Sequence, residues 1–171
     1  MTLTDLEKTA EALIIIKRSG IIQPDAVIGI HSPWPDQIEQ IKSVFPESVL
    51  HTYFYRDEQK WDILEESKGF HDLLCFQNVF HYINAPGIAF KNVFNSCRYL
   101  LFQDRIIRDR GKKNTIFCDD GDCMRYRIGP VKSNFESAFD LLSLNSNIVF
   151  CTPYLDDGLF IHVISLFKGF L

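Results

Sequence analysis

The chain has 171 residues, of which 46% are hydrophobic and 23% are charged, so we expect one folded globular domain over residues 1–171 and not a disordered chain. The net charge of −4 at pH 7 provides no basic surface for nucleic-acid binding, and no apolar run reaches the roughly 18 residues that a membrane span needs. Five cysteines without a secretory signal in the first residues favour a reducing, cytoplasmic environment.

Helices and strands alternate in the first third of the chain. Apolar residues at helical spacing predict a helix that Thr4 caps and Gly20 ends. A short buried strand is predicted over 25–30, and a helix whose apolar face lies over 38–45 follows it. The β-branched and aromatic residues of 49–55 predict a second strand.

The alternation continues through the middle of the chain. Residues 60–65 are interpreted as a third strand, with a helical turn as the alternative. A buried strand is expected over 72–76, and an amphipathic helix over 86–97 follows it. A further buried strand over 99–102 leads into the charged stretch 104–113, which is interpreted as an exposed, salt-bridged segment.

The last third completes an α/β pattern. Residues 111–133 are expected to form a long loop, and 135–142 an amphipathic helix. Two apolar strands over 147–152 and 159–167 are separated by an Asp-Asp-Gly sequence at 156–158, which is typical of a β-hairpin. The whole alternation predicts a three-layer α/β sandwich, with a mostly parallel sheet and a C-terminal antiparallel hairpin. Ligands of such sheets bind beyond the carboxyl ends of the strands.

The segment Phe70–Ile83, FHDLLCFQNVFHYI, resembles the fourth strand and following turn of class I S-adenosylmethionine (SAM)-dependent methyltransferases, where an FDlv…nvlhhi pattern recurs. Arg98–Arg105 is similar to the fifth strand of that family, and Trp61–Leu64 is similar to the end of its third strand. The order of elements is similar as well. The resemblance covers residues 45–110 best and implies a Rossmann-like methyltransferase sheet with a SAM site.

The turn after the first strand departs from the family pattern. Methyltransferases have a GxGxG turn there, because missing side chains let the backbone approach the cofactor. Here residues 28–35 read IGIHSPWP, so Gly29 is the only glycine of this segment. The resemblance implies that Trp34 would fill the space of the methionine part of SAM. Proline also fixes φ and removes N–H donors. We therefore expect a degenerate loop at which SAM binding is weakened or lost.

The resemblance implies four cofactor-binding residues, which are Gly29, Asp57, Asp62 and Asn78. Asp57 would accept hydrogen bonds from the ribose hydroxyls and Asp62 from the adenine amine, while Asn78 follows the fourth strand at the ligand edge. The alternative for the two aspartates is that they are solvated loop carboxylates.

The turn after the fourth strand also contains the candidate catalytic residues. His81 or Tyr82 would remove a proton from the substrate, since imidazole titrates near neutral pH. The alternative is that His81 is a structural residue of the turn. The acidic segment Cys118–Cys123 has no second Cys or His pair elsewhere, so it is interpreted as a turn and no metal site is expected.

Two function hypotheses follow from the residues and the resemblance. In the first, the chain is a methyltransferase-like protein that has lost normal SAM binding and acts as a binding or partner subunit. Its ligand would be a small molecule or a protein, with no role for nucleic acid or membrane. In the second, the chain is an active SAM-dependent methyltransferase that acts on a small molecule. A homodimer, in which a second copy covers aromatic surface, is a third expectation.

Overall fold

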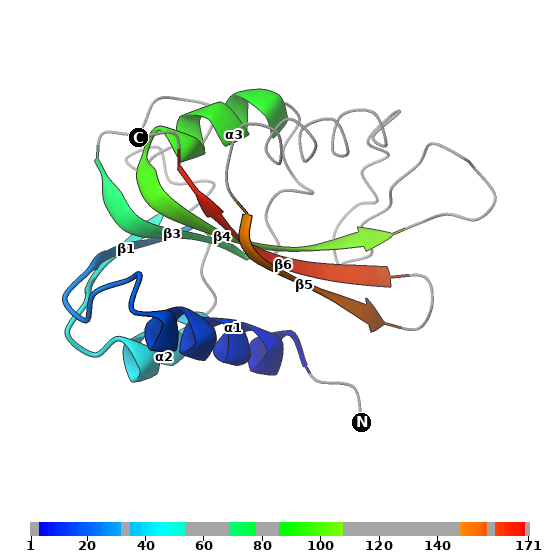
Figure 1. Ribbon diagram of the computed structural model, residues 1–171, viewed down its shortest axis with the longest axis horizontal. Helices are drawn as coiled ribbons and strands as arrows, with labels where there is room; N and C mark the ends of the chain where they lie inside the picture. Colours follow the sequence, from blue (N-terminus) through cyan, green and yellow to red (C-terminus); the bar gives the residue numbers. More distant parts are fainter. Residues whose placement is uncertain are drawn as a thin grey trace.

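One sheet with the strand order β2-β1-β3-β4-β6-β5 forms the centre of the molecule (Figure 1). The computed structural model describes residues 4–31, 35–53, 69–77, 86–107, 148–156 and 160–169. The strands are β1 (Val27–His31), β2 (Val49–Tyr53), β3 (His71–Gln77), β4 (Cys97–Ile107), β5 (Ile148–Asp156) and β6 (Phe160–Lys168). Strands β1 to β4 run parallel, while β6 is antiparallel to both β4 and β5. The predicted parallel sheet with an antiparallel hairpin is confirmed.

Helices cover both faces of this sheet (Figure 1). Helices α1 (Asp5–Ser19) and α2 (Pro35–Val44) pack on one face, and α3 (Pro86–Phe94) packs on the other. Because successive side chains of a strand point to opposite faces, Ile30 of β1 lies in the core under α1 and α2, while Leu74 of β3 lies in the core under α3. The arrangement is the predicted three-layer α/β sandwich.

Helix α1 begins and ends where the sequence predicts. The Thr4 hydroxyl accepts a hydrogen bond from the Glu7 backbone N–H at 3.3 Å, and the Glu7 carboxylate accepts one from the Thr4 backbone N–H at 2.6 Å. This capping box satisfies N–H groups that the first helical turn leaves without partners. At the other end, Gly20 adopts φ 71° and donates to the Lys17 carbonyl. A left-handed residue ends the helix at low cost because glycine has no Cβ.

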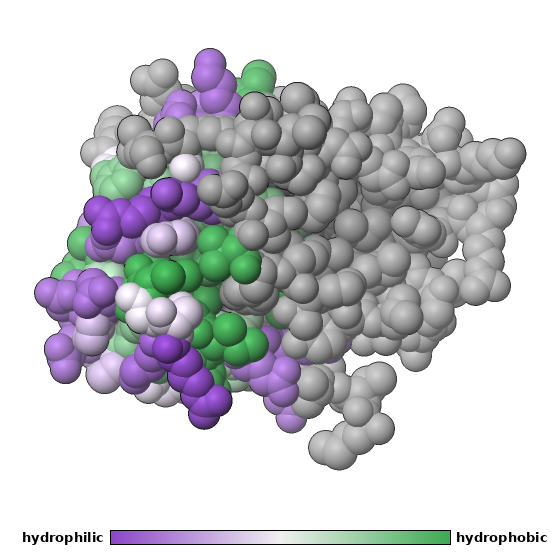
Figure 2. Space-filling view, viewed as in Figure 1, coloured by the Kyte–Doolittle hydropathy of each residue, from purple (hydrophilic) through white to green (hydrophobic). Residues whose placement is uncertain are grey.

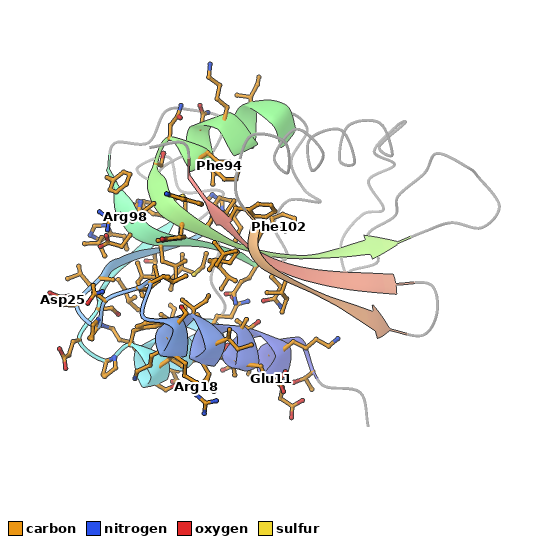
Figure 3. The ribbon with its side chains drawn as sticks, in the orientation of Figure 1. Glu11, Arg18, Asp25, Phe94, Arg98 and Phe102 are labelled. Carbon is orange, nitrogen blue, oxygen red and sulfur yellow. The ribbon has the colours of Figure 1, made fainter. Side chains whose placement is uncertain are left out.

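The outer surface of α1 is partly apolar. Ile14 and Ile15 are 40% and 50% exposed, next to the exposed charged residues Glu11 and Arg18 (Figure 3). Figure 2 shows hydrophobic surface lying among hydrophilic side chains over the layer that α1 and α2 form. None of the helices that the structure describes is both long enough and apolar enough to cross a membrane.

The boundary between α3 and β4 differs from the sequence prediction. The helix predicted over 86–97 ends at Phe94, and Cys97 is already the first residue of β4. Strand β4 also continues to Ile107 and does not end at residue 102, because β6 pairs with it along this whole length. The pairing gives backbone partners to part of the charged stretch. Because β6 is distant in sequence, the residues of this stretch alone do not predict that it forms a strand.

Some predicted elements lie outside the described residues. They are the strand over 60–65, the loop over 111–133 and the helix over 135–142, and they stay predictions. The predicted C-terminal hairpin is described, and its two strands pair from Ile148 opposite Phe167 to Asp156 opposite Phe160.

Two buried cysteines lie on neighbouring inner strands of the sheet. Cys75 of β3 and Cys97 of β4 are free thiols with no exposed surface. Burial raises the pKa of Cys75 from its usual 9.0 to about 12, and burial raises the pKa of Cys97 as well. Since the thiolate is the reactive form, both cysteines should be inert while the chain is folded.

We expect iodoacetamide to modify Cys75 and Cys97 only after unfolding, which peptide mapping of the labelled chain will show. Stability should also depend on alkaline pH, because the folded chain holds these thiol protons more tightly than the unfolded chain. The contribution of Cys75 is complete below pH 9.0 and is lost as the pH rises toward about 12, which urea unfolding on either side of pH 9.0 measures. Rapid labelling of either cysteine in the native protein at neutral pH would contradict this.

Candidate functional site

The carboxyl ends of the parallel strands meet at one edge of the sheet, where open α/β sheets bind their ligands. His31 ends β1 and lies opposite Tyr53 of β2 and Phe76 of β3. Gln77 ends β3 and lies opposite Gln103 of β4. These five residues define the carboxyl edge of this chain.

An aromatic stack closes the end of β1. His31 has no exposed surface, and its ring stacks on Phe76 with the centroids 5.0 Å and the planes 14° apart. Helix α2 begins at Pro35, so only the sequence Ser-Pro-Trp, without a glycine, joins β1 to α2. Aromatic rings therefore occupy the sheet surface at the point where a glycine-rich turn would expose backbone to a ligand.

A buried polar group ends β3. Gln77 is 1% exposed, and its Nε2 donates to Oε1 of Gln103 at 3.3 Å. The hydroxyl of Thr9, from α1, donates to the same oxygen. In the part of the chain that the structure describes, Oε1 of Gln77 accepts no hydrogen bond, and an unsatisfied buried acceptor costs about 1–3 kcal/mol. A hydroxyl, amine or amide N–H of a ligand would satisfy this oxygen.

Gly29, which the resemblance assigns to the cofactor, lies in the middle of β1 between His51 of β2 and Leu74 of β3. A Cβ at this position would lie 2.6 Å from Cδ1 of Leu74 and 2.7 Å from Cδ2 of His71. Side chains of β3 therefore fill the space that the missing side chain of Gly29 provides. Contact between Gly29 and a cofactor stays a prediction.

His71 has hydrogen bonds at both ring nitrogens. Nδ1 lies 3.2 Å from the carbonyl oxygen of Ser96, and Nε2 lies 2.7 Å from the hydroxyl of Tyr53. Since a carbonyl can only accept, Nδ1 carries the proton and the Tyr53 hydroxyl donates to Nε2. Burial is the main cause of the lowered pKa of His71, and burial also raises the pKa of Tyr53. Both directions favour the neutral hydrogen bond over an imidazolium–phenolate pair.

Five of the predicted site residues lie outside the described residues, namely Asp57, Asp62, Asn78, His81 and Tyr82. Asn78 directly follows Gln77, and the two aspartates follow β2 in sequence. The roles of all five stay predictions, and the Cys118–Cys123 segment lies outside the described residues as well.

Sequence analysis missed three residues that make side-chain hydrogen bonds, namely Tyr53 and Gln77 at the carboxyl edge and His71 at the start of β3. A usable signal for Gln77 is its place at the end of a buried strand, directly before the predicted Asn78. Tyr53 and His71 are 18 residues apart, and only the pairing of β1 with both β2 and β3 brings their side chains together.

No protein-family model and no curated protein matches this chain, whereas solved structures match it along most of its length. One is the O-methyltransferase from a trans-AT PKS multienzyme of Brevibacillus brevis in complex with S-adenosyl-L-homocysteine, with 12% identity, a TM-score of 0.61, and 95% of this chain and 72% of that chain covered. Another is the Burkholderia thailandensis 1,6-didemethyltoxoflavin-N1-methyltransferase with bound 1,6-didemethyltoxoflavin and S-adenosylhomocysteine, with 8% identity, a TM-score of 0.60, and coverage of 97% and 78%. A third is the magnesium protoporphyrin IX methyltransferase from Synechocystis PCC 6803 with bound SAM, with 8% identity, a TM-score of 0.55, and coverage of 99% and 86%.

This chain has the class I methyltransferase fold. The predicted methyltransferase-like sheet is thereby confirmed, including its C-terminal hairpin, since each match covers at least 95% of the chain. Because the identities are low, this methyltransferase-like chain resembles these proteins in its backbone and not in its side chains. The side chains of its carboxyl edge are its own and have to be interpreted from their own contacts.

Proposed function

We propose that this methyltransferase-like chain binds SAM weakly or not at all and acts as a binding or partner subunit. The observation that carries the proposal is the fully buried His31 ring, stacked on Phe76 where β1 and β3 end. A glycine-rich turn binds SAM through backbone atoms at the end of the first strand, and side chains must not cover these atoms. Two buried aromatic rings stand at the matching ends of the strands.

The sequence between β1 and α2 supports the same proposal. Residues 32–34 contain no glycine. Pro33 within this segment and Pro35 directly after it each lack a backbone N–H, so two possible donors are missing. Backbone N–H groups at the start of a helix are a ready source of hydrogen bonds to anionic groups. Pro35 supplies none at the first residue of α2, so this turn is poor in donors for a ligand carboxylate.

A partner role is further supported by the partly apolar surface of α1. Ile14 and Ile15 are 40% and 50% exposed, so a partner that packs on α1 could bury both side chains. Light scattering on the purified chain tests one form of this role. A mass of two chains identifies the partner as a second copy, whereas a mass of one chain excludes a stable homodimer.

Isothermal titration calorimetry with SAM, and separately with S-adenosylhomocysteine, tests the loss of cofactor binding. We expect no heat of binding, and no rise in melting temperature at millimolar ligand. A ligand that binds only the folded state must stabilise it, by about 2.7 kcal/mol when its concentration is 100 times its Kd. Binding at micromolar concentration would overturn the proposal.

The second candidate function is an active SAM-dependent methyltransferase acting on a small molecule. The observation that favours it is the buried Oε1 of Gln77 at the carboxyl edge, an acceptor placed where a ligand would supply a donor. Methyl transfer would then be an in-line attack of the substrate on the sulfonium carbon, promoted mainly by proximity and orientation, with His81 or Tyr82 removing a proton.

The same titration discriminates this candidate through single variants. If SAM binds, Asp57→Ala and Asp62→Ala should each weaken it, because each removes a proposed acceptor for the nucleoside. Gln77→Leu should weaken a ligand that donates to the buried oxygen, and Gln23→Leu, on the exposed turn after α1, is the matched control. Unchanged affinity in both aspartate variants would remove them from the site.

A further inference from the structure

Three side chains with metal-binding atoms surround Gly29 on the face of the sheet that α3 covers. His51 lies directly opposite Gly29 on β2, and Tyr53 is two residues further along the same strand, on the same face. The His71 ring lies over Gly29 from the β3 side, since a Cβ at Gly29 would be 2.9 Å from its Nε2. The missing side chain of Gly29 thus makes room for the His71 ring beside Leu74. This ring lies on the same face of the sheet as His51 and Tyr53.

These groups are close enough to share one ion after a small movement, because the ligand atoms of a tetrahedral Zn²⁺ lie about 3.3 Å apart. The Tyr53 oxygen and Nε2 of His71 are 2.7 Å apart, and the ring centroids of His51 and His71 are 5.5 Å apart. Zn²⁺ lies about 2.0–2.2 Å from nitrogen and oxygen ligands, so atoms that share the ion are close neighbours of one another. His51 is exposed, so its ring can turn toward the other two groups without disturbing the core.

The hydrogen bond between His71 and Ser96 prepares the imidazole for this role. Nδ1–H donates to the Ser96 carbonyl, which leaves the lone pair on Nε2, the atom that faces Tyr53 and Gly29. Histidines that bind metals usually donate their other ring N–H to a carbonyl or carboxylate in this way, which fixes the tautomer and the orientation of the ring.

We propose that His51, Tyr53 and His71 form a binding site for a divalent transition-metal ion. Among the described residues no three His, Cys, Asp or Glu side chains could hold a metal, so the third donor of this site is a phenol. Two imidazoles and one phenolate oxygen suit Zn²⁺ and Cu²⁺ and disfavour Mg²⁺ and Ca²⁺, which require mainly oxygen ligands. This proposal is independent of whether the chain binds SAM.

Binding replaces the hydrogen bond between Tyr53 and His71. The ion forms one bond to Nε2 of His71 and one to the Tyr53 oxygen, and the hydroxyl proton that Tyr53 donated leaves to solvent. Three protein ligands leave at least one position of a four-coordinate ion for water or another ligand. One proton, from the Tyr53 hydroxyl, is therefore released for each ion bound.

Calorimetric titration of the chelator-treated chain with ZnCl₂ tests the site. Repeating the titration in a second buffer of different ionisation enthalpy gives the number of protons released. We expect one Zn²⁺ per chain and release of a proton. His51→Ala should weaken binding by about tenfold or more, as should Tyr53→Phe, which also removes the proton release. Cu²⁺ should give a phenolate-to-copper absorption band that Tyr53→Phe abolishes. His162→Ala, in β6, is the matched control and should bind like the unaltered chain.

Circular dichroism establishes that each variant is folded, and His51→Ala is the most secure of them because the side chain is exposed. Lack of Zn²⁺ binding at millimolar concentration would overturn the proposal. Unchanged binding in both His51→Ala and Tyr53→Phe would do so too, as would a loss in His162→Ala as large as that in His51→Ala.

Discussion

Replacing Phe94 by alanine should lower the free energy of unfolding by about 3–5 kcal/mol. Phe94 is the last residue of α3 and has no exposed surface. Its ring packs edge-on against Phe167 of β6, with the centroids 5.9 Å apart and the planes 80° apart, and Figure 3 shows it between α3 and the sheet that carries Phe102. Removing the ring loses its burial and leaves a cavity that helix and sheet cannot close.

Urea unfolding, monitored by circular dichroism, measures this loss. The matched control is Phe70→Ala, since Phe70 is 45% exposed and should cost only about 1 kcal/mol or less. A double-mutant cycle with Phe167→Ala should give a coupling of about 0.5–1.5 kcal/mol for the pair of rings. Equal costs for Phe94→Ala and Phe70→Ala would show that α3 does not pack on the sheet as described.

Gly29→Ala should destabilise the chain by about 1–3 kcal/mol, although the same change stabilises many proteins. Alanine lowers the entropy of the unfolded chain, which favours folding by about 0.4–1 kcal/mol. Here the new Cβ would lie 2.6 Å from Leu74 and 2.7 Å from His71, closer than packed atoms approach each other. Leu74 is buried and His71 is held by two hydrogen bonds, so neither side chain can move away cheaply. The clash should therefore exceed the entropic gain.

The control for this prediction is Gly69→Ala, because a Cβ at Gly69 meets no atom within 4 Å. The effect of Gly29→Ala should also be smaller in a His71→Ala background, since the ring that the Cβ would meet is then absent. Denaturant unfolding of the unaltered chain, the three single variants and the Gly29→Ala/His71→Ala double variant measures both comparisons. An equal cost of Gly29→Ala with and without His71 would mean that the His71 ring is not what requires glycine at this position.

This prediction separates two explanations for the glycine in the middle of the first strand. The family resemblance assigns Gly29 to a cofactor, and the structure places the His71 ring against it. If His71 is the reason, the position needs glycine even in a chain that never binds SAM. Glycine would then be required because it leaves space for the His71 ring, and so for its hydrogen bond with Tyr53, whether or not a metal ion occupies the site.

The sequence by itself determined the fold class and the order of the elements that the structure describes. Thr4 and Gly20 mark the ends of α1 because capping chemistry is local, and the apolar runs of β1 and β3 mark buried strands because their faces both meet helices. The Asp-Asp-Gly sequence at 156–158 similarly predicts the hairpin that the structure confirms. The glycine-poor turn after β1 could also be seen in the sequence, and the proposed loss of SAM binding begins there.

Only the tertiary structure decided which side chains meet. The length of β4 depends on β6, which follows it by more than fifty residues. Cys97 belongs to a strand because it lies opposite His71 of β3. Tyr53 reaches His71 because β1 pairs with both β2 and β3, and the missing Cβ of Gly29 leaves room between them. Strand pairing brings together residues that are far apart in sequence, and the local periodicity of a strand does not predict which strand lies beside it.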